Sequence, residues 1–133
     1  MSPDYRPMSV LFDLDGTLVD TAPDMAYALN RLLAEHGKPD LSYETIRPHV
    51  SNGARGLLGL GFRVDTPHPE YEELRQRFLD LYERDICAHS RLFEGMDEVL
   101  QVLESHGIIW GIVTNKPGWL TQPLVEALNI HQR

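Results

Sequence analysis

The feature that most constrains this chain is a short apolar run that ends in two carboxylates. Val10-Leu11-Phe12 has the length and side chains of a strand buried on both faces, and Gly16 ends it in a turn. Functional groups of α/β proteins gather at the carboxyl ends of such strands. Because side chains alternate along an extended backbone, Asp13 and Asp15 lie on the same side of it and can share one divalent cation. The pattern predicts a catalytic site.

The Asp-x-Asp-Gly pattern has two other interpretations, a solvated turn and the opening of a calcium-binding loop. A helix-loop-helix calcium loop has glycine at its sixth position and glutamate at its twelfth. Here Gly16 is fourth, and the twelfth position is Asp24, in an expected helix start. A solvated turn would not require a buried strand directly before it, so the catalytic interpretation is favoured.

A second apolar run, Ile108 to Val113, also has the character of a buried strand and also ends in polar residues. Thr114-Asn115-Lys116 supplies a hydroxyl, an amide and an ammonium at the same end of a strand as Asp13 and Asp15. The hydroxyl and the amide can hydrogen-bond phosphoryl oxygens, and the lysine adds positive charge for a dianion. The alternative is an ordinary polar turn, but the pairing with the first strand favours a functional role.

The stretch between the two strands has helical periodicity. Thr21 is expected to cap a helix that ends at Gly37, and a weaker helix is predicted over Ser42 to Arg47. A longer helix is predicted from Glu70 to about Ile86, with charges on the face opposite its apolar stripe. The segment of residues 22–90 is longer than a simple crossover between two strands requires. We therefore predict that it forms a small helical module inserted between the two strands.

Inside this module, the glycine-rich stretch from Ser51 to Gly56 is predicted to be a link between helices. Asn52, Gly53 and Arg55 are candidates for a substrate-selecting loop, because glycine allows close backbone approach and an arginine can pair a carboxylate or phosphate. A solvent-exposed turn is the alternative interpretation.

Composition excludes several classes of partner. Twelve Lys and Arg residues against twenty Asp and Glu residues give a net charge of −8, which repels nucleic acid and anionic membranes. The first seven residues lack the apolar core of a signal peptide, and Ile108 to Val113 is too short to cross a bilayer. The single cysteine, Cys87, permits no internal disulfide. We therefore expect a cytoplasmic protein with no nucleic-acid or membrane partner; its oligomeric state is left open.

The segment from Phe12 to Thr21, FDLDGTLVDT, resembles the first motif of the haloacid dehalogenase-like hydrolase superfamily. Thr114-Asn115-Lys116-Pro117 resembles the second motif, in the form found in phosphoglycolate phosphatase-like members. The resemblance covers nearly the whole chain and is equally close to N-acetylmuramic acid 6-phosphate phosphatases. It implies an α/β fold: a Rossmann-like parallel sheet with only the first two core strands present, formed by residues 1–21 and 91–133, and a helical cap formed by residues 22–90.

The resemblance also implies a reaction, namely Mg²⁺-dependent hydrolysis of a small phosphorylated metabolite, phosphoglycolate or a sugar phosphate. Asp13 would be the nucleophile that forms an aspartyl phosphate, and Asp15 the acid and base. Mg²⁺ would be bound by the Asp13 carboxylate and the Asp15 backbone carbonyl. Gly16, together with Thr114, Asn115 and Lys116, would bind the phosphate.

The sequence departs from the family pattern near its end. The pattern continues with a third-motif lysine and a fourth-motif acidic pair, whereas after Lys116 the chain has Glu126 as its only acidic side chain and no further lysine. We therefore expect the N-terminal part of a longer enzyme, with poor turnover on its own. Two alternatives stay open: a sugar phosphomutase of the same superfamily, and a non-catalytic fragment or binding module that lacks the downstream motifs.

Overall fold

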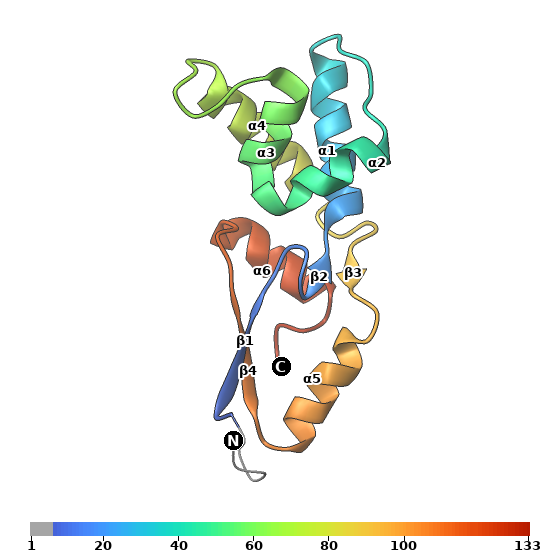
Figure 1. The fold of residues 1–133 in the computed structure, drawn as a ribbon, viewed down its shortest axis with the longest axis vertical. Coiled ribbons are helices and arrows are strands. Elements are labelled where there is room, and N and C mark those ends of the chain that lie inside the picture. Colours follow the sequence, from blue (N-terminus) through green and yellow to red (C-terminus); the bar gives the residue numbers. More distant parts are fainter. Residues whose placement is uncertain (1–6) are drawn as a thin grey trace.

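The computed structural model describes residues 7–133 as an elongated molecule with a helical end and a sheet-containing end (Figure 1). Residues 1–6 lie outside the described residues. They make up most of the N-terminal segment that lacks the apolar core of a signal peptide. The elements in chain order are β1 (Ser9–Asp13), β2 (Val19–Asp20), α1 (Ala22–Glu35), α2 (Tyr43–Ile46), the 3-10 helix η1 (Arg47–Asn52), α3 (Gly53–Phe62), α4 (Tyr71–Arg84), β3 (Arg91–Leu92), α5 (Met96–Ser105), β4 (Ile109–Val113) and α6 (Gly118–Ala127).

The two predicted strands, β1 and β4, are confirmed and pair in parallel. Val10 lies opposite Trp110 and Phe12 opposite Ile112 on the inner face of the sheet. The rings of Phe12 and Trp110 meet edge to face, with centroids 6.2 Å apart. Trp110 belongs to an apolar cluster with Leu100 of α5 and two residues of α6, so both helices cover this inner face. The parallel pairing brings the carboxyl ends of β1 and β4 together.

The prediction that these strands are buried on both faces is wrong for the described residues. Leu11, Ile109 and Val113 are 67%, 74% and 59% exposed. Alternation explains the split, because these residues point away from the face that α5 and α6 cover. Apolar composition identified the strands correctly, but within residues 7–133 only one face has a partner.

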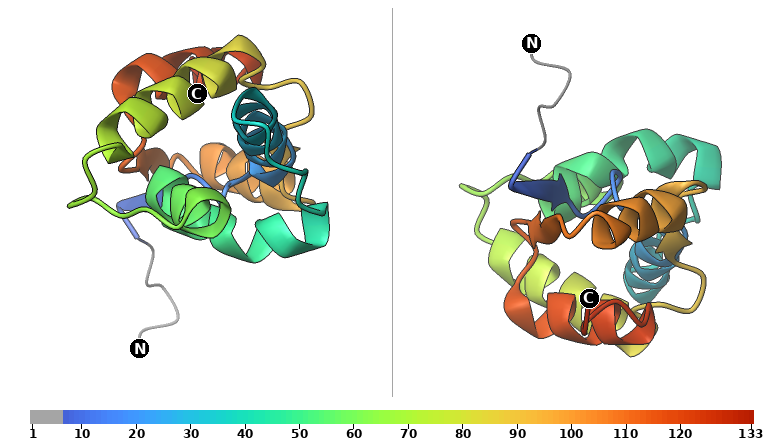
Figure 2. Two further views of the ribbon diagram at one scale, coloured as in Figure 1. Left: turned by 90° about the horizontal axis from the view of Figure 1, so that it is seen from above. Right: turned by 90° about the horizontal axis from the view of Figure 1, so that it is seen from below.

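The helices predicted between the strands are confirmed as α1, α2 and α4, and α1 and α4 form a bundle with α3, which the sequence did not predict as a helix. The chain from α1 to α4 lies at one end of the molecule, and α1, α3 and α4 contact one another there (Figures 1 and 2). They enclose an apolar cluster distinct from the one beneath the sheet; Leu120 of α6 also belongs to it, and Ile86 packs against both clusters. Its fully buried side chains include Leu29, Leu32, Leu57, Leu58 and Phe78. Amphipathic faces turned toward a common centre provide the stability of this part.

The expected glycine-rich link is not a loop. Ser51 and Asn52 end η1, and α3 begins at Gly53 with no loop residue between them, although the φ of +64° at Gly53 breaks the helical path there. Glycine has low helix propensity, which is why the sequence suggested a link. Packing overrides this preference here, because Leu57 and Leu58 are fully buried against the bundle.

Two chain connections join the helical bundle to the sheet, and they run side by side. The outgoing connection contains β2 and the returning one β3, and these pair antiparallel with Val19 opposite Leu92. Asp24, in the first turn of α1, is 2% exposed and fixes the returning connection. Its carboxylate accepts hydrogen bonds from the His89 and Ser90 N–H groups and from the Ser90 hydroxyl. Sequence patterns indicated neither the short β2–β3 pair nor this clamp.

None of the helices described in residues 7–133 combines the length and the apolar character that a membrane crossing requires.

Candidate active site

A cavity of about 490 Å³ lies where the carboxyl ends of β1 and β4 face the helical bundle. The sheet side contributes Asp13, Asp15 and the segment Thr114 to Pro117, and the bundle contributes residues of α1, η1, α3 and α4. The predicted phosphate-binding residue Gly16 does not line the cavity; it forms a turn with φ of +78°, a conformation that residues with a Cβ rarely adopt. The structure therefore places both predicted carboxylates and the predicted Thr-Asn-Lys segment at one cavity.

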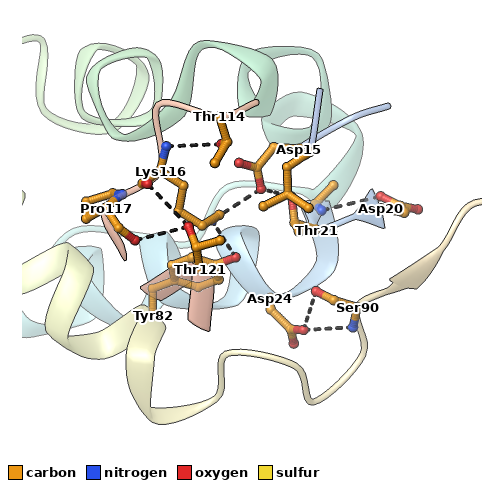
Figure 3. Close-up of polar contacts among 12 residues, drawn as sticks. Asp15, Asp20, Thr21, Asp24, Tyr82, Ser90, Thr114, Lys116, Pro117 and Thr121 are labelled. Atoms are coloured by element: carbon orange, nitrogen blue, oxygen red, sulfur yellow. Dashed lines mark hydrogen bonds and ion pairs between the residues drawn. The ribbon is translucent and has the colours of Figure 1, made fainter. Parts of the chain in front are cut away.

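Asp13 and Asp15 are held differently. Asp13 is exposed at the end of β1, and its Oδ1 accepts a hydrogen bond from the Leu14 N–H at 2.9 Å. Asp15 Oδ1 accepts a hydrogen bond from the Thr21 hydroxyl at 2.8 Å, as Figure 3 shows. Thr21 is the residue before α1, as predicted, but its side chain makes no capping hydrogen bond. Its hydroxyl instead orients the Asp15 carboxylate.

Lys116 occupies the centre of the polar network (Figure 3). Its Nζ lies 3.2 Å from Asp15 Oδ1 and donates a hydrogen bond to the Tyr82 hydroxyl at 2.9 Å. The ammonium also lies 4.3 Å from the centre of the Tyr82 ring, within the range of a cation–π contact. The Lys116 side chain is 5% exposed, so this charge is nearly desolvated and depends on these partners.

Burial sets the electrostatics of this network. Desolvation lowers the pKa of Lys116, while the neighbouring Asp15 carboxylate opposes that shift. Desolvation also raises the pKa of Tyr82, and the charge of Asp15 adds to the effect. The Tyr82 phenol therefore stays neutral and acts as a hydrogen-bond acceptor for the ammonium.

The remaining residues of the second motif are placed by local hydrogen bonds. The Lys116 N–H donates to Thr114 Oγ1 at 3.1 Å, which closes a tight turn after β4. The Thr121 hydroxyl donates to the carbonyl oxygens of Lys116 and Pro117 at 3.2 and 3.1 Å. Asn115 is exposed and also lines the cavity. The hydroxyl, amide and ammonium thus gather opposite the two carboxylates.

The predicted selecting residues Asn52, Gly53 and Arg55 also line the cavity. Arg55, however, forms a two-point ion pair with Asp65, with its Nε 2.6 Å from Oδ1 and its Nη2 2.9 Å from Oδ2. This pairing holds the pKa of Asp65 below its usual value. The guanidinium predicted to pair a substrate anion is therefore engaged by a carboxylate of the protein.

Sequence reasoning missed three residues of this region, namely Tyr82, Arg75 and Asp24. Tyr82 was assigned only to an apolar stripe, yet its hydroxyl contacts Lys116. The charges of this helix are expected on the face opposite the apolar stripe, yet Arg75 lines the cavity. Helical spacing held the signal for Arg75, because positions 71, 75, 78 and 82 fall on one face. Asp24 carried no such signal, since its partners are 65 and 66 residues away.

The donor set suits a hard divalent cation. Mg²⁺ prefers oxygen ligands and is commonly bound by one or two carboxylates, with water and phosphate oxygens completing its shell. Asp13 offers an exposed carboxylate at the cavity, next to the chain turn that contains Asp15. Within residues 7–133, no group of three or more His, Cys, Asp or Glu side chains is placed to hold a metal ion. The residues therefore fit a site that depends on few protein ligands.

The fold and site define an α/β protein of Rossmann-like type, with its polar groups at the carboxyl ends of parallel strands and a helical insertion facing them. The chain belongs to the haloacid dehalogenase-like hydrolase family, whose sequence model matches residues 10–133.

Curated relatives agree with this assignment. The chain is 43% identical over 128 residues to an N-acetylmuramic acid 6-phosphate phosphatase of Pseudomonas putida, covering 96% of this chain and 57% of the relative. It is 43% identical over 127 residues to a phosphoglycolate phosphatase of Xanthomonas campestris pv. campestris, with the same coverage of 96% and 57%. The chain thus spans little more than half the length of these relatives.

Solved structures have the same fold. The crystal structure of a predicted phosphoglycolate phosphatase from Haemophilus somnus superposes with a TM-score of 0.77 at 31% identity, over 92% of this chain and 58% of that one. A haloacid dehalogenase-like family hydrolase from Streptococcus pneumoniae superposes with a TM-score of 0.77 at 25% identity, over 94% and 57%. The predicted fold class is confirmed.

Proposed function

We propose that the chain carries the nucleophile half of a phosphatase site that hydrolyses a small phosphate monoester. The observation that supports this most directly is the cavity that holds Asp13 and Asp15 beside Thr114 and Lys116. A carboxylate nucleophile, a second carboxylate for proton transfer and cationic or hydroxyl groups for phosphoryl oxygens are what phosphoryl transfer through a covalent intermediate requires.

In the proposed reaction, an oxygen of Asp13 attacks phosphorus and the ester P–O bond breaks. The leaving alkoxide takes a proton from the Asp15 carboxyl group. The Asp15 carboxylate then removes a proton from water, whose oxygen attacks the aspartyl phosphate and releases inorganic phosphate and free Asp13. The Thr21 hydroxyl and Lys116, which contact Asp15 Oδ1, hold the acid and base in place.

The phosphoryl oxygens would be bound by groups from both strand ends. Thr114 and Asn115 offer a hydroxyl and an amide, and Lys116 offers the positive charge. Gly16, the fourth predicted phosphate-binding residue, does not line the cavity, and its N–H donates to the Val19 carbonyl oxygen at 2.9 Å. Mg²⁺ held by Asp13 and the Asp15 carbonyl would reduce the repulsion between a carboxylate nucleophile and an anionic substrate.

We also propose that residues 1–21 and 91–133 belong to the catalytic core and residues 22–90 to a cap. The two apolar clusters and the paired connections at β2 and β3 support this division, although Leu120 of α6 belongs to the bundle cluster and Ile86 packs against both. A cap of this kind excludes water and contributes groups that select the substrate. Substrate selection is the proposed role of Asn52 and Gly53, which line the cavity.

The names of the relatives suggest the substrate. Phosphoglycolate and N-acetylmuramic acid 6-phosphate each carry a phosphate ester on a hydroxyl group and a separate free carboxylate. We propose that the substrate is one of these two or a close analogue, in the cytoplasm.

Two measurements test the proposal. Phosphate release from both esters, followed with Mg²⁺ present, should be abolished by Asp13→Asn and unaffected by Asp40→Asn, the same change at an exposed position. Because turnover of this chain can be slow, ¹⁹F spectra of the protein with beryllofluoride, a mimic of a phosphorylated carboxylate, give a second readout. A beryllofluoride signal that persists in Asp13→Asn would contradict the proposed nucleophile. Absence of phosphate release from a broad panel of esters by a longer version that carries the third- and fourth-motif residues would contradict the phosphatase function.

A further inference from the structure

One face of helix α4 forms a wall of the cavity. Tyr71, Arg75, Phe78, Leu79 and Tyr82 line it, and their spacing of three, four and seven residues places them on one side of the helix. Four of the five are aromatic or aliphatic and at most 5% exposed. Arg75 is the single charged residue of α4 that lines the cavity.

The Arg75 guanidinium has no carboxylate partner within residues 7–133, where it also forms no hydrogen bond. Four other arginines of the described chain form ion pairs with acidic side chains: Arg47, Arg55, Arg77 and Arg133. The other arginines of residues 7–133 without such a pair, Arg31, Arg63, Arg84 and Arg91, are exposed, whereas Arg75 is partly buried. A partly buried guanidinium on an apolar wall is costly unless an anion joins it. Arg75 therefore points to an anionic ligand.

The charges around the cavity indicate which anion. Three cationic side chains line it within the described residues: Arg55, Arg75 and Lys116. Arg55 is neutralised by Asp65, and Lys116 lies beside Asp15 where the phosphoryl group is proposed to bind. One guanidinium without a partner remains, and its planar fork of donors matches a single carboxylate. A second phosphate would call for more positive charge than this wall offers.

We propose that Arg75 is a specificity-determining residue that binds the carboxylate of a substrate carrying both a phosphate ester and a carboxylate. The inference rests on the proposed phosphatase function and defines its substrate class. Arg75 belongs to the bundle wall and the nucleophile Asp13 to the sheet wall, so the two ends of one small molecule would be recognised from different sides. An ester without the carboxylate leaves the guanidinium unpaired and binds more weakly.

Two matched pairs of ligands isolate the carboxylate. Phosphoglycolate is compared with ethyl phosphate, and N-acetylmuramic acid 6-phosphate with N-acetylglucosamine 6-phosphate, which lacks the lactyl acid. Affinities of this chain with Mg²⁺ present are measured by calorimetry or NMR titration. In at least one of the two comparisons, the ligand with the carboxylate should bind at least about tenfold more tightly than the ligand without it. This is the difference expected for a charge-assisted hydrogen bond between Arg75 and the carboxylate.

Arg75→Gln should remove this preference and leave binding of the ligand without a carboxylate within about twofold. Arg84→Gln, the same change at an exposed position of the same helix outside the cavity, should keep the preference. Arg75→Lys should restore part of it. Where turnover is measurable, Arg75→Gln should raise KM for the carboxylate ester more than it lowers kcat, since the group it binds is remote from the reacting phosphorus.

Three results would overturn the proposal: a wild-type chain with no preference in either pair, an Arg75→Gln chain that retains the preference, or equal weakening of both ligands of a pair. The first two would show that Arg75 does not bind the carboxylate, and the third that it acts through general charge or folding. Lack of hydrolysis by a longer version that carries the third- and fourth-motif residues, together with an intact, Arg75-dependent binding preference, would contradict the phosphatase function and still support the carboxylate site.

Discussion

The Tyr82 hydroxyl accepts a hydrogen bond from the Lys116 ammonium at 2.9 Å and so joins helix α4 to the turn after β4. These residues belong to different parts of the fold, one to the helical bundle and the other to the end of the parallel sheet (Figure 3). A lysine proposed to bind phosphate is thus positioned in part by the helices that face it. Movement of the bundle relative to the sheet would change the surroundings of this ammonium.

Tyr82→Phe should destabilise the fold by about 1 to 3 kcal/mol, because it removes an acceptor from a nearly desolvated ammonium and leaves the ring in place. Urea unfolding followed by circular dichroism measures this difference. Tyr27→Phe is the matched control: its hydroxyl contacts Arg31 at 3.5 Å, and Tyr27 is 51% exposed. The control should change the free energy of unfolding by less than about 0.5 kcal/mol. Equal effects of the two substitutions would contradict a special role of the Tyr82 hydroxyl.

Asp24→Ala should be among the most destabilising single changes outside the apolar clusters, at about 3 kcal/mol or more. The buried carboxylate satisfies the His89 and Ser90 N–H groups and the Ser90 hydroxyl, and removal leaves these donors without a partner. Hydrogen exchange at His89 and Ser90 should accelerate more than exchange within the strands. Asp40→Ala, at an exposed position, is the control. Unchanged exchange at Ser90 in Asp24→Ala would exclude this clamp.

The sequence was sufficient for those parts of the site that follow directly from a strand. Asp13, Asp15 and Thr114-Asn115-Lys116 each lie within three residues of a strand end, so local pattern located them and parallel pairing brought them to one cavity. Contacts between distant residues could not be predicted in this way. The Tyr82–Lys116 hydrogen bond spans 34 residues, and it depends on how the bundle is seated on the sheet.

Arg75 and Arg55 show why residue type alone does not identify a ligand-binding group. The sequence favours Arg55 because an arginine in a glycine-rich stretch can pair a substrate carboxylate or phosphate, yet Asp65, ten residues on, pairs with its guanidinium. Arg75 lies in a helix rich in charges, where an arginine is expected on the solvent side. Which guanidinium stays without a carboxylate partner depends on the packing of α3 and α4, which sequence periodicity does not specify.

Acidification should weaken the contribution of the ion pair between α1 and α4. Arg77 donates hydrogen bonds to both carboxylate oxygens of Glu35, at 2.9 and 2.6 Å, and holds the pKa of Glu35 below its ordinary value of 4.5. A carboxyl group with a lowered pKa in the folded state adds stability above its unfolded pKa and loses it as the pH falls through the folded value. Arg77→Gln should therefore lower the free energy of unfolding slightly at pH 7, and the difference from wild type should shrink as the pH falls below 4.5 and vanish below the folded-state pKa of Glu35.

The control for this pH dependence is Arg63→Gln, which also removes one positive charge but lies at an exposed position with no ion pair in the described chain. Its difference from wild type should not follow the titration of Glu35. Unfolding free energies measured in urea between pH 7 and pH 3 compare the two variants. A difference for Arg77→Gln that stays constant across this range would show that the pair contributes through packing and not through charge.

Two glycines of helix α3 should respond to alanine in opposite directions. A Cβ at Gly56 would stand 2.5 Å from Asn52 Cβ and 3.0 Å from the His49 carbonyl oxygen, whereas at Gly59 the nearest atom is the Val64 carbonyl oxygen at 3.9 Å. Gly59→Ala should therefore stabilise the protein by about 0.5 to 1 kcal/mol, because alanine has less backbone entropy to lose on folding. Gly56→Ala should destabilise it by roughly 1 to 3 kcal/mol, since η1 must shift to admit the methyl group. Urea unfolding of both variants measures the two effects, and equal stabilisation by both would show that η1 and α3 are not in close contact at Gly56.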